Sequence, residues 1–305
     1  MEKKENVFMQ SDYAITTSNL TKRFGRKTVL DALSLRVPRG SVFAFLGRNG
    51  AGKTTAIRIM LDLLDKNSGE VQILGLDSVK ESREIRRRIG YVAQNEEMYG
   101  WMTVDQHIWF CQGFYPTWDH ALVAELKAKL ELPGKMKVRD LSRGKQAQMA
   151  LLLAMAYRPE LLILDEPTAG LDVVVRRDFM EEVIELIQEE GRTIFYSSHL
   201  VHEVERVADW VGILDDGKLI YCAPMEELKA RTRRIVCQFT APPPAPPRLP
   251  GLLGTETVGK ELLLTVRDYS EETLASVKTL HPVALQVEDL GLEDIFVAMV
   301  GKGKE

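Results

Sequence analysis

The chain has 305 residues, of which 45% are apolar and 28% charged, the balance of a folded protein with a sizeable core. Its formal net charge of −4 argues against general attraction to nucleic acid or anionic lipid, because no excess of cations neutralises phosphates. Three widely spaced cysteines without a C-x-x-C pair argue against a disulfide framework and a zinc site, and favour a reducing cytosol.

No segment has the length of a membrane span. The longest apolar run, residues 149–157, has nine residues, whereas about 20 are needed to cross a bilayer. The N-terminal residues 1–6 also lack the apolar core of a signal peptide. We therefore expect a chain that neither spans a membrane nor is exported by a standard signal.

The first part of the chain reads as strands around one helix. Short β-branched and aromatic runs predict strands, and an apolar pattern of helical spacing after a glycine-rich turn predicts a helix. The expected strands are 13–17, 33–37, 42–46, 71–74 and 90–93, and the expected helix is 54–64. The strand 42–46 is apolar throughout, which predicts burial on both faces.

Residues 96–160 read as an inserted helical subdomain that includes a helix at 119–132. Alternation then resumes, with strands at 161–164 and 193–196 and helices at 174–190 and 200–208. Such alternation predicts an α/β fold with a mostly parallel sheet covered by helices.

The last part of the chain is set apart by a proline-rich segment. Residues 241–250 hold six of the thirteen prolines, which favours extended polyproline geometry in a linker or exposed loop. A small α+β domain begins near Arg234 and closes with a helix at 292–300. We therefore predict two domains, 13–230 and 231–305.

A glycine-rich turn between the predicted strand 42–46 and helix 54–64 matches the P-loop pattern G-x-x-x-x-G-K-[ST]. Its amides are expected to surround phosphate oxygens, Lys53 to reach the β- and γ-phosphates, and Thr54 to hold Mg²⁺. The expected phosphate contacts are Gly47, Arg48, Asn49, Gly50, Ala51, Gly52, Lys53, Thr54 and Thr55.

Two adjacent carboxylates follow the apolar strand 161–164. Asp165 ends the run and Glu166 comes next. Downstream of a P-loop, an adjacent parallel strand brings the first carboxylate to the Mg²⁺ shell, and the second can polarise the attacking water. We therefore predict Asp165 as a metal ligand and Glu166 as a catalytic residue.

The stretch 141–148 places two cations at the start of a helix. Ser142 can act as the N-cap, and Gly144 lets the backbone approach a partner closely. Arg143 and Lys145 lie where the helix dipole already presents positive partial charge, which is unfavourable unless an anion is present. The sequence therefore predicts an anion at this helix end.

The ordered series of motifs over about residues 13–230 resembles the ATP-binding subunit of an ABC transporter. Besides the P-loop and the Asp165–Glu166 pair, residues 141–145 occupy the position of the family's signature loop. Gln94 resembles the Q-loop glutamine, Asp172 in 170–172 the D-loop aspartate, and His199 the switch histidine. Phe24 matches the aromatic residue that stacks on adenine.

The resemblance implies a P-loop NTPase fold, with an antiparallel β-subdomain and an inserted helical subdomain beside the mostly parallel sheet. It also implies a head-to-tail dimer around two ATP molecules. The anion at the signature helix is then the γ-phosphate held by the partner's P-loop, contacted by Ser142 and Gly144. The resemblance also implies catalysis by Glu166, His199, Lys53 and Gln94, with Mg²⁺ held by Thr54, Gln94 and Asp165. Asp172 can in addition cap the helix that follows it.

The signature loop departs from the usual L-S-G-G-Q, since Arg143 replaces a glycine and Lys145 replaces the glutamine. Arg143 lacks the backbone freedom of glycine. Two interpretations stay open at this point. The two cations can add favourable charge to the ATP-bound dimer, or both side chains can point to solvent.

Seven aromatic residues lie near the start of the helical subdomain: Tyr99, Trp101, Trp109, Phe110, Phe114, Tyr115 and Trp118. We expect most of them in the core of this subdomain. The alternative is a docking surface for a membrane partner, in which the 99–101 end, close to Gln94, contacts a cytoplasmic helix of that partner.

The leading hypothesis is therefore the ATPase of a transporter whose multi-spanning permease is a separate chain, peripheral on the inner face of the cell membrane. Export is expected because residues 290–299 resemble the tail of single-cassette subunits from bacterial export systems. A soluble cassette acting on ribosomes or DNA is the alternative, although the acidic balance predicts no nucleic-acid partner. A third alternative is another P-loop enzyme, such as a nucleotide kinase. Such an enzyme would not need the signature loop, the D-loop and His199 together, which argues against it.

Overall fold

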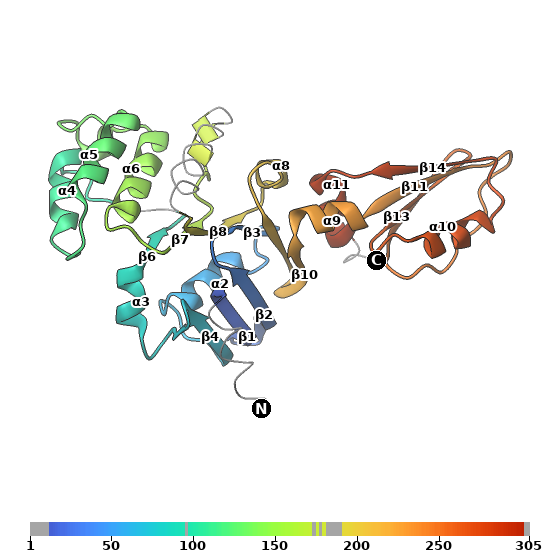
Figure 1. Cartoon of the computed structure of the whole chain (residues 1–305), viewed down its shortest axis with the longest axis horizontal. Helices are drawn as coiled ribbons and strands as arrows, with labels where there is room; N and C mark the ends of the chain where they lie inside the picture. The colour runs from blue at the N-terminus through green and yellow to red at the C-terminus, as the bar shows by residue number, and fades with distance from the viewer. Residues whose placement is uncertain (1–11, 95–96, 173–174, 177–178, 181–190, 302–305) are drawn as a thin grey trace. The chain divides into compact units, whose positions relative to one another are not determined.

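A computed structural model describes residues 12–94, 97–172, 175–176, 179–180 and 191–301 (Figure 1). The chain forms two compact units. The first contains Met1–His199 and Gly212–Tyr221, and the second contains Leu200–Val211 and Cys222–Glu305. The predicted domains 13–230 and 231–305 stay a prediction.

The first unit contains an antiparallel sheet in the order β2-β1-β4-β5. Its strands are β1 (Tyr13–Phe24), β2 (Lys27–Pro38), β4 (Ser68–Ile73) and β5 (Leu76–Asp77). β1 and β2 are longer than the predicted runs because pairing carries both strands through polar residues, with several register irregularities. The predicted antiparallel subdomain is therefore confirmed.

The main sheet has the order β10-β9-β3-β8-β7-β6. Its strands are β3 (Val42–Gly47), β6 (Ile89–Val92), β7 (Leu161–Asp165), β8 (Thr193–Ser198), β9 (Trp210–Asp215) and β10 (Lys218–Pro224). β3, β8, β7 and β6 pair in parallel. Every residue of β3, β7 and β8 is buried, as their apolar runs predict for strands covered on both faces.

The predicted helix 54–64 is shorter than expected. It forms α2 (Lys53–Met60), because Leu61 caps the helix and Asp62 turns into the left-handed region with φ 55°. The apolar residues beyond Met60 imitate helical spacing without continuing the helix. No pattern in the sequence predicts α3 (Ser82–Arg88), in which only Ile85 is buried.

The predicted helical subdomain consists of α4 (Val104–Gln112), α5 (His120–Lys129), a 3₁₀ turn η1 (Val138–Asp140) and α6 (Arg143–Met155), with α4, α5 and α6 side by side (Figure 1). α5 ends before the predicted residue 132, because Glu131 adopts a left-handed φ of 47°. Among the described residues, no helix is long and apolar enough to span a bilayer.

α6 lies directly on the main sheet. A Cβ atom added to Gly90 of β6 would lie 2.5 Å from the carbonyl oxygen of Ala154 in α6, closer than real Cβ contacts. Only glycine permits this approach without a shift of one element. Because α6 starts at the signature loop, residues 141–145, the glycine in β6 helps to fix where that loop lies.

Of two further predicted helices, 174–190 lies mostly outside the described residues and 200–208 is shorter than expected. Residues 175–176 and 179–180 are helical, and the rest of the predicted helix 174–190 lies outside the described residues. The predicted helix 200–208 is reduced to α8 (Val201–Val204), followed by turns.

The second unit has its own antiparallel sheet in the order β12-β13-β11-β14. Its elements are α9 (Met225–Arg231), β11 (Arg233–Gln238), β12 (Leu252–Val258), β13 (Glu261–Val266), α10 (Glu271–Lys278), β14 (Ala284–Asp289) and α11 (Leu292–Val300). Ile235, Leu264 and Val277 belong to its core, and the predicted helix 292–300 coincides with α11. The proline-rich segment links β11 to β12 without regular structure, as predicted.

Candidate active site

The P-loop, residues 47–54, connects the buried strand β3 to α2. Gly50 and Gly52 have left-handed φ angles of 83° and 111°. Added Cβ atoms would lie 2.6 Å from the Leu214 carbonyl oxygen at Gly47 and 2.9 Å from the Val29 carbonyl oxygen at Gly52. The loop therefore needs glycine both for its turns and for its close contacts with neighbouring backbone.

The N-terminus of α2 is open to an anionic ligand. Gly52 is the N-cap, and among the described residues no side-chain cap hydrogen bond is made at this end of the helix. Arg48, Asn49 and Gly50 are exposed, whereas Ala51 is buried and Thr55 is half-buried. A helix N-terminus without a side-chain cap, its dipole and the exposed residues 48–50 are features that favour an anion such as phosphate.

Lys53, the first residue of α2, folds back over the loop. Its Nζ donates hydrogen bonds to the carbonyl oxygens of Gly47 at 2.7 Å and Arg48 at 3.3 Å. It also forms an ion pair with Glu166 Oε1 at 3.0 Å. Both side chains are nearly inaccessible, 4% exposed for Lys53 and 8% for Glu166, so this pair is desolvated.

Glu166 directly follows β7 and is held from two sides. Its backbone has a left-handed φ of 46°, which is uncommon for a residue with a side chain and concentrates at functional sites. Its N–H donates to Ser197 Oγ at 3.0 Å, and its Oε2 lies 2.9 Å from His199 Nδ1. The structure therefore brings the predicted Lys53, Glu166 and His199 together in one group.

Asp165 lies beside this group and receives two hydroxyl groups. Thr54 Oγ1 donates to Asp165 Oδ1 at 3.2 Å, and Ser197 Oγ donates to the same oxygen at 2.7 Å. Burial raises the pKa of the Asp165 carboxyl above its usual value, and the hydrogen bonds from Ser197 and Thr54 act in the opposite direction. Thr54 and Asp165 thus offer adjacent oxygen donors, the ligand chemistry that Mg²⁺ prefers.

Comparison with known proteins identifies the family of this chain. Residues 30–169 match the family model described as ABC transporter. The bacitracin transport ATP-binding protein BcrA of Bacillus licheniformis is 36% identical over 225 residues, which cover 72% of each chain. The chain belongs to the ABC transporter family. ATP-binding subunits of ABC transporters are ATPases, and this chain is one of them.

Other relatives extend the similarity. The daunorubicin resistance ATP-binding protein DrrA3 of Streptomyces coeruleorubidus is 31% identical over 313 residues, covering 95% of this chain and 97% of the relative. Among solved structures, cbiO1 from Clostridium perfringens, described as part of the ABC transporter complex cbiONQ, is 26% identical with a TM-score of 0.64. That match covers 72% of this ABC transporter subunit and 91% of cbiO1, and it confirms the predicted P-loop NTPase fold.

The signature loop of this ABC transporter subunit starts α6 as predicted. Ser142 is the N-cap, and its exposed Oγ accepts the Lys145 N–H at 3.2 Å. Arg143 has an ordinary helical backbone, so the loss of glycine at this position causes no strain. A Cβ atom at Gly144 would lie 2.6 Å from Val175 Cγ1, so only glycine fits between α6 and the chain after the D-loop.

Three predicted residues lie outside the group of Lys53, Glu166 and His199. Gln94 is exposed two residues after β6, and Phe24 is half exposed at the end of β1 with Lys22 Nζ 4.9 Å from its ring centroid. Asp172 Oδ1 accepts the Val175 N–H at 3.1 Å, the capping role that the sequence predicted. Within the described part of the chain, no hydrogen bond or ion pair joins these three to Lys53 or Glu166.

Sequence reasoning did not assign a role to Ser197. This residue lies opposite Asp165 in the parallel register of β7 and β8, where its hydroxyl bridges the Asp165 carboxylate and the Glu166 amide. The only available signal was its position two residues before His199. Because the relevant pairing links residues 32 positions apart, local spacing could not reveal it.

We expect Ser197→Ala to lower the free energy of unfolding by about 1–3 kcal/mol, because the buried Glu166 N–H loses its acceptor. ATPase activity is expected to fall about tenfold, since Glu166 loses the contact that helps to hold its left-handed backbone. Denaturant unfolding and steady-state ATPase assays measure the two effects. Ser276→Ala, at an exposed position in α10, is the matched control, and wild-type values for Ser197→Ala would contradict the bridging role.

The aromatic residues of the helical subdomain are not a buried core, and this expectation was wrong. Tyr99, Trp101, Trp109 and Phe114 are exposed, with Trp109 at 74%. Tyr99 contacts Trp101, and Phe110 lies edge-on to both Tyr99 and Phe114. Aliphatic residues such as Leu126 and Leu151 fill the interior of the subdomain and leave the larger rings at its surface.

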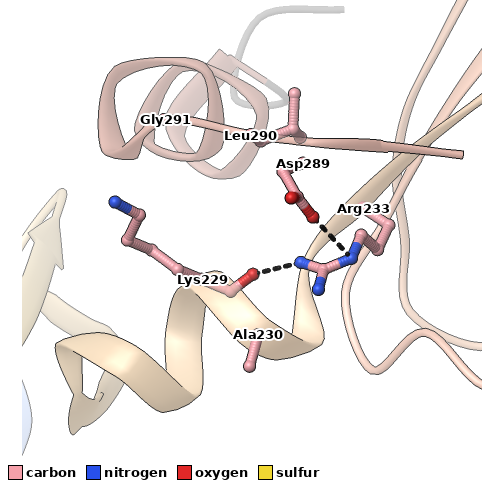
Figure 2. Close-up of a pocket in the computed structure, with 6 residues that line it drawn as sticks. All are labelled: Lys229, Ala230, Arg233, Asp289, Leu290 and Gly291. Carbon is pink, nitrogen blue, oxygen red and sulfur yellow. Dashed lines mark hydrogen bonds and ion pairs between the residues drawn. The ribbon is translucent and has the colours of Figure 1, made fainter.

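The second unit contains a separate cavity of about 430 Å³ (Figure 2). Its lining consists of Lys229, Ala230, Arg233, Asp289, Leu290 and Gly291. The Arg233 guanidinium lies between the Asp289 carboxylate, at 3.1 Å, and the Lys229 carbonyl oxygen, as Figure 2 shows. Lys229 Nζ pairs with Glu205 at 2.7 Å. Both cations are therefore engaged within the unit, and the cavity is charge-balanced.

Proposed function

We propose that two copies of this ATPase, or one copy and a close relative, close head-to-tail around two ATP molecules and drive a separate membrane permease in export. The observation that carries the proposal is the contact of buried Lys53 and Glu166 with half-buried His199, next to the exposed P-loop residues 48–50. The capped start of α6, with exposed Ser142, supplies the second half of such a site from the opposite subunit.

In this mechanism Glu166 accepts a proton from the water that attacks the γ-phosphoryl group. Lys53 releases Glu166 and contacts the β- and γ-phosphates, while His199 stabilises the charge that develops on the equatorial oxygens. Gln94 senses the γ-phosphate and relays its presence to the helical subdomain. The backbone amides of 47–55 surround the phosphates, as the open N-terminus of α2 favours.

The remaining site residues have positioning or binding roles. Phe24 stacks on adenine, and Asp172 belongs to the D-loop at the subunit boundary. Thr54, Asp165 and Gln94 would hold Mg²⁺, which neutralises phosphate charge when bound. Ser142 and the Gly144 amide contact the γ-phosphate that the opposite P-loop holds. Their place at a helix N-terminus favours an anion there.

The exposed aromatic patch, defined as Tyr99, Trp101, Trp109 and Phe114, is the proposed contact for the permease. Its residues lie on α4 and the segments that flank it, and apolar rings at a surface favour burial against a partner. The subunit would thus be held on the inner face of the cell membrane. Export is supported by relatives named for bacitracin transport and daunorubicin resistance.

A crosslinking experiment tests the head-to-tail arrangement. Asn49→Cys, on the exposed P-loop, and Ser142→Cys are prepared as separate proteins in a Glu166→Gln background, with Cys111 and Cys222 replaced by serine. A short bifunctional crosslinker should join the two proteins only when MgATP is present. Asn49→Cys with Ser276→Cys is the control pair. Failure of the first pair to crosslink under ATP would contradict the proposed dimer.

Purification from membranes tests for the permease. The chain is tagged and purified with whatever binds it. A multi-spanning protein that co-purifies supports the transporter function, and ribosomal RNA or DNA supports the soluble alternative. Replacing Trp101 and Trp109 by serine should release the membrane protein without loss of ATPase activity in the isolated subunit.

A further inference from the structure

The side chain of Lys145, the residue that departs from the usual signature glutamine, is engaged inside its own subunit. Its Nζ donates a hydrogen bond of 2.6 Å to the carbonyl oxygen of Leu130. Leu130 is the C-cap of α5, and Lys145 is the third residue of α6. Lys145 is half-buried, so its amine neither points freely to solvent nor remains available as an exposed charge.

The electrostatics of two helix ends explain this contact. A cation in the first turn of α6 is disfavoured by the positive end of that helix dipole. The carbonyl groups at the end of α5 lack partners within their helix and carry negative partial charge. The Lys145 side chain extends from the start of α6 to the end of α5. Its charge therefore lies at the negative end of the α5 dipole, where it gives the Leu130 carbonyl oxygen a hydrogen-bond donor.

A second contact holds the same turn of α6 from another side. Gln146 Nε2 donates to the carbonyl oxygens of Val138 and Leu141, both at 3.2 Å. The start of α6 is therefore tied to the end of α5 and to the segment that precedes the signature loop. Ser142, the N-cap between these ties, remains exposed.

We infer that Lys145 is a positioning residue that fixes the start of α6 against α5 and so orients Ser142 and the first amides of α6 toward nucleotide. This inference rests on the proposed dimer and deepens it, because the Lys145 cation could either hold its own subunit together or contact the phosphate of the opposite subunit. The Lys145 charge is satisfied within the subunit and is not delivered to the phosphate of the opposite subunit. Of the two signature cations, only Arg143 is exposed.

Three substitutions test the contact of Lys145 with α5. Lys145→Met keeps length without a donor, Lys145→Arg keeps both donor and charge, and Lys137→Met removes an exposed lysine of the same subdomain as a control. In a Glu166→Gln background, Lys145→Met should weaken ATP-dependent dimerisation about tenfold, and Lys145→Arg should restore it. ATP binding by single subunits should be unchanged in all three.

Salt dependence tells the two uses of the charge apart. The Lys145 charge is satisfied within the subunit, so the dimerisation constant of Lys145→Met should change with salt concentration as steeply as that of the parent protein. A weaker dependence on salt in Lys145→Met would place the charge on the phosphate and overturn the inference. Equal dimerisation of Lys145→Met and the parent protein would also overturn it. In the otherwise wild-type protein, Lys145→Met should raise the KM for ATP more than it lowers kcat.

Failure of the parent Glu166→Gln protein itself to dimerise would contradict the proposed function and not the role of Lys145. In that case, hydrogen exchange of backbone amides in single subunits tests whether Lys145 ties α6 to α5. Lys145→Met should speed exchange of the amides at 130–132 and 143–146, and Lys145→Arg should restore protection. Exchange in Lys145→Met that matches the parent protein would overturn the tie between α5 and α6.

Discussion

Replacing Glu166 by glutamine is expected to lower kcat for ATP hydrolysis by about 10²–10⁴-fold while ATP binding persists. The amide keeps the shape of the carboxylate but cannot accept a proton from water. It also removes the negative charge that pairs with Lys53 at 3.0 Å, which leaves the lysine available to phosphate. Closed dimers should therefore accumulate under MgATP, because the step that opens them is blocked.

Steady-state ATPase assays at saturating MgATP and size-exclusion chromatography with and without ATP measure these two effects. Glu125→Gln carries the same chemical change at an exposed position of α5 and should behave as wild type. Hydrolysis at the normal rate by Glu166→Gln would contradict the assignment of the catalytic carboxylate. Loss of ATP binding would instead indicate that the substitution disturbs the P-loop.

Replacing Lys53 by methionine is expected to raise the Kd for ATP by about 10²-fold, because a charge-assisted contact with phosphate is lost in a desolvated site. Methionine retains the length and apolar stem of the side chain, so the comparison isolates the ammonium group. Titration with a fluorescent ATP analogue measures the change, with Lys137→Met as the exposed control. Wild-type affinity in Lys53→Met would refute the phosphate contact.

The same substitution should destabilise the protein without nucleotide. Lys53→Met leaves Glu166, 8% exposed, without its cation, and an uncompensated buried charge is costly. Adding Glu166→Gln removes that charge, so the double variant should unfold at a higher temperature than Lys53→Met alone. Thermal unfolding of the four proteins in this cycle measures the coupling. Additive effects would show that the two side chains do not act as a pair.

The sequence predicts the geometry of the P-loop well because its requirements lie in contiguous residues. The glycines of 47–52 are required by local backbone conformation, and Lys53 follows them directly. The apolar run before Asp165 and Glu166 likewise identifies a buried strand and its end. Helix ends were less predictable, because the left-handed turns at Asp62 and Glu131 stop apolar patterns that still have helical spacing.

By itself, the sequence determined the P-loop, the two carboxylates after β7, the alternation that yields a parallel sheet, and the N-cap of α6. Only the tertiary structure decided which distant groups meet: Ser197 with Asp165, and Lys145 with the Leu130 carbonyl. It also decided that Tyr99, Trp101, Trp109 and Phe114 lie at the surface. Local motifs follow from backbone geometry within a few residues, whereas hydrogen-bond partners and burial depend on strand register and helix packing between segments far apart in the chain.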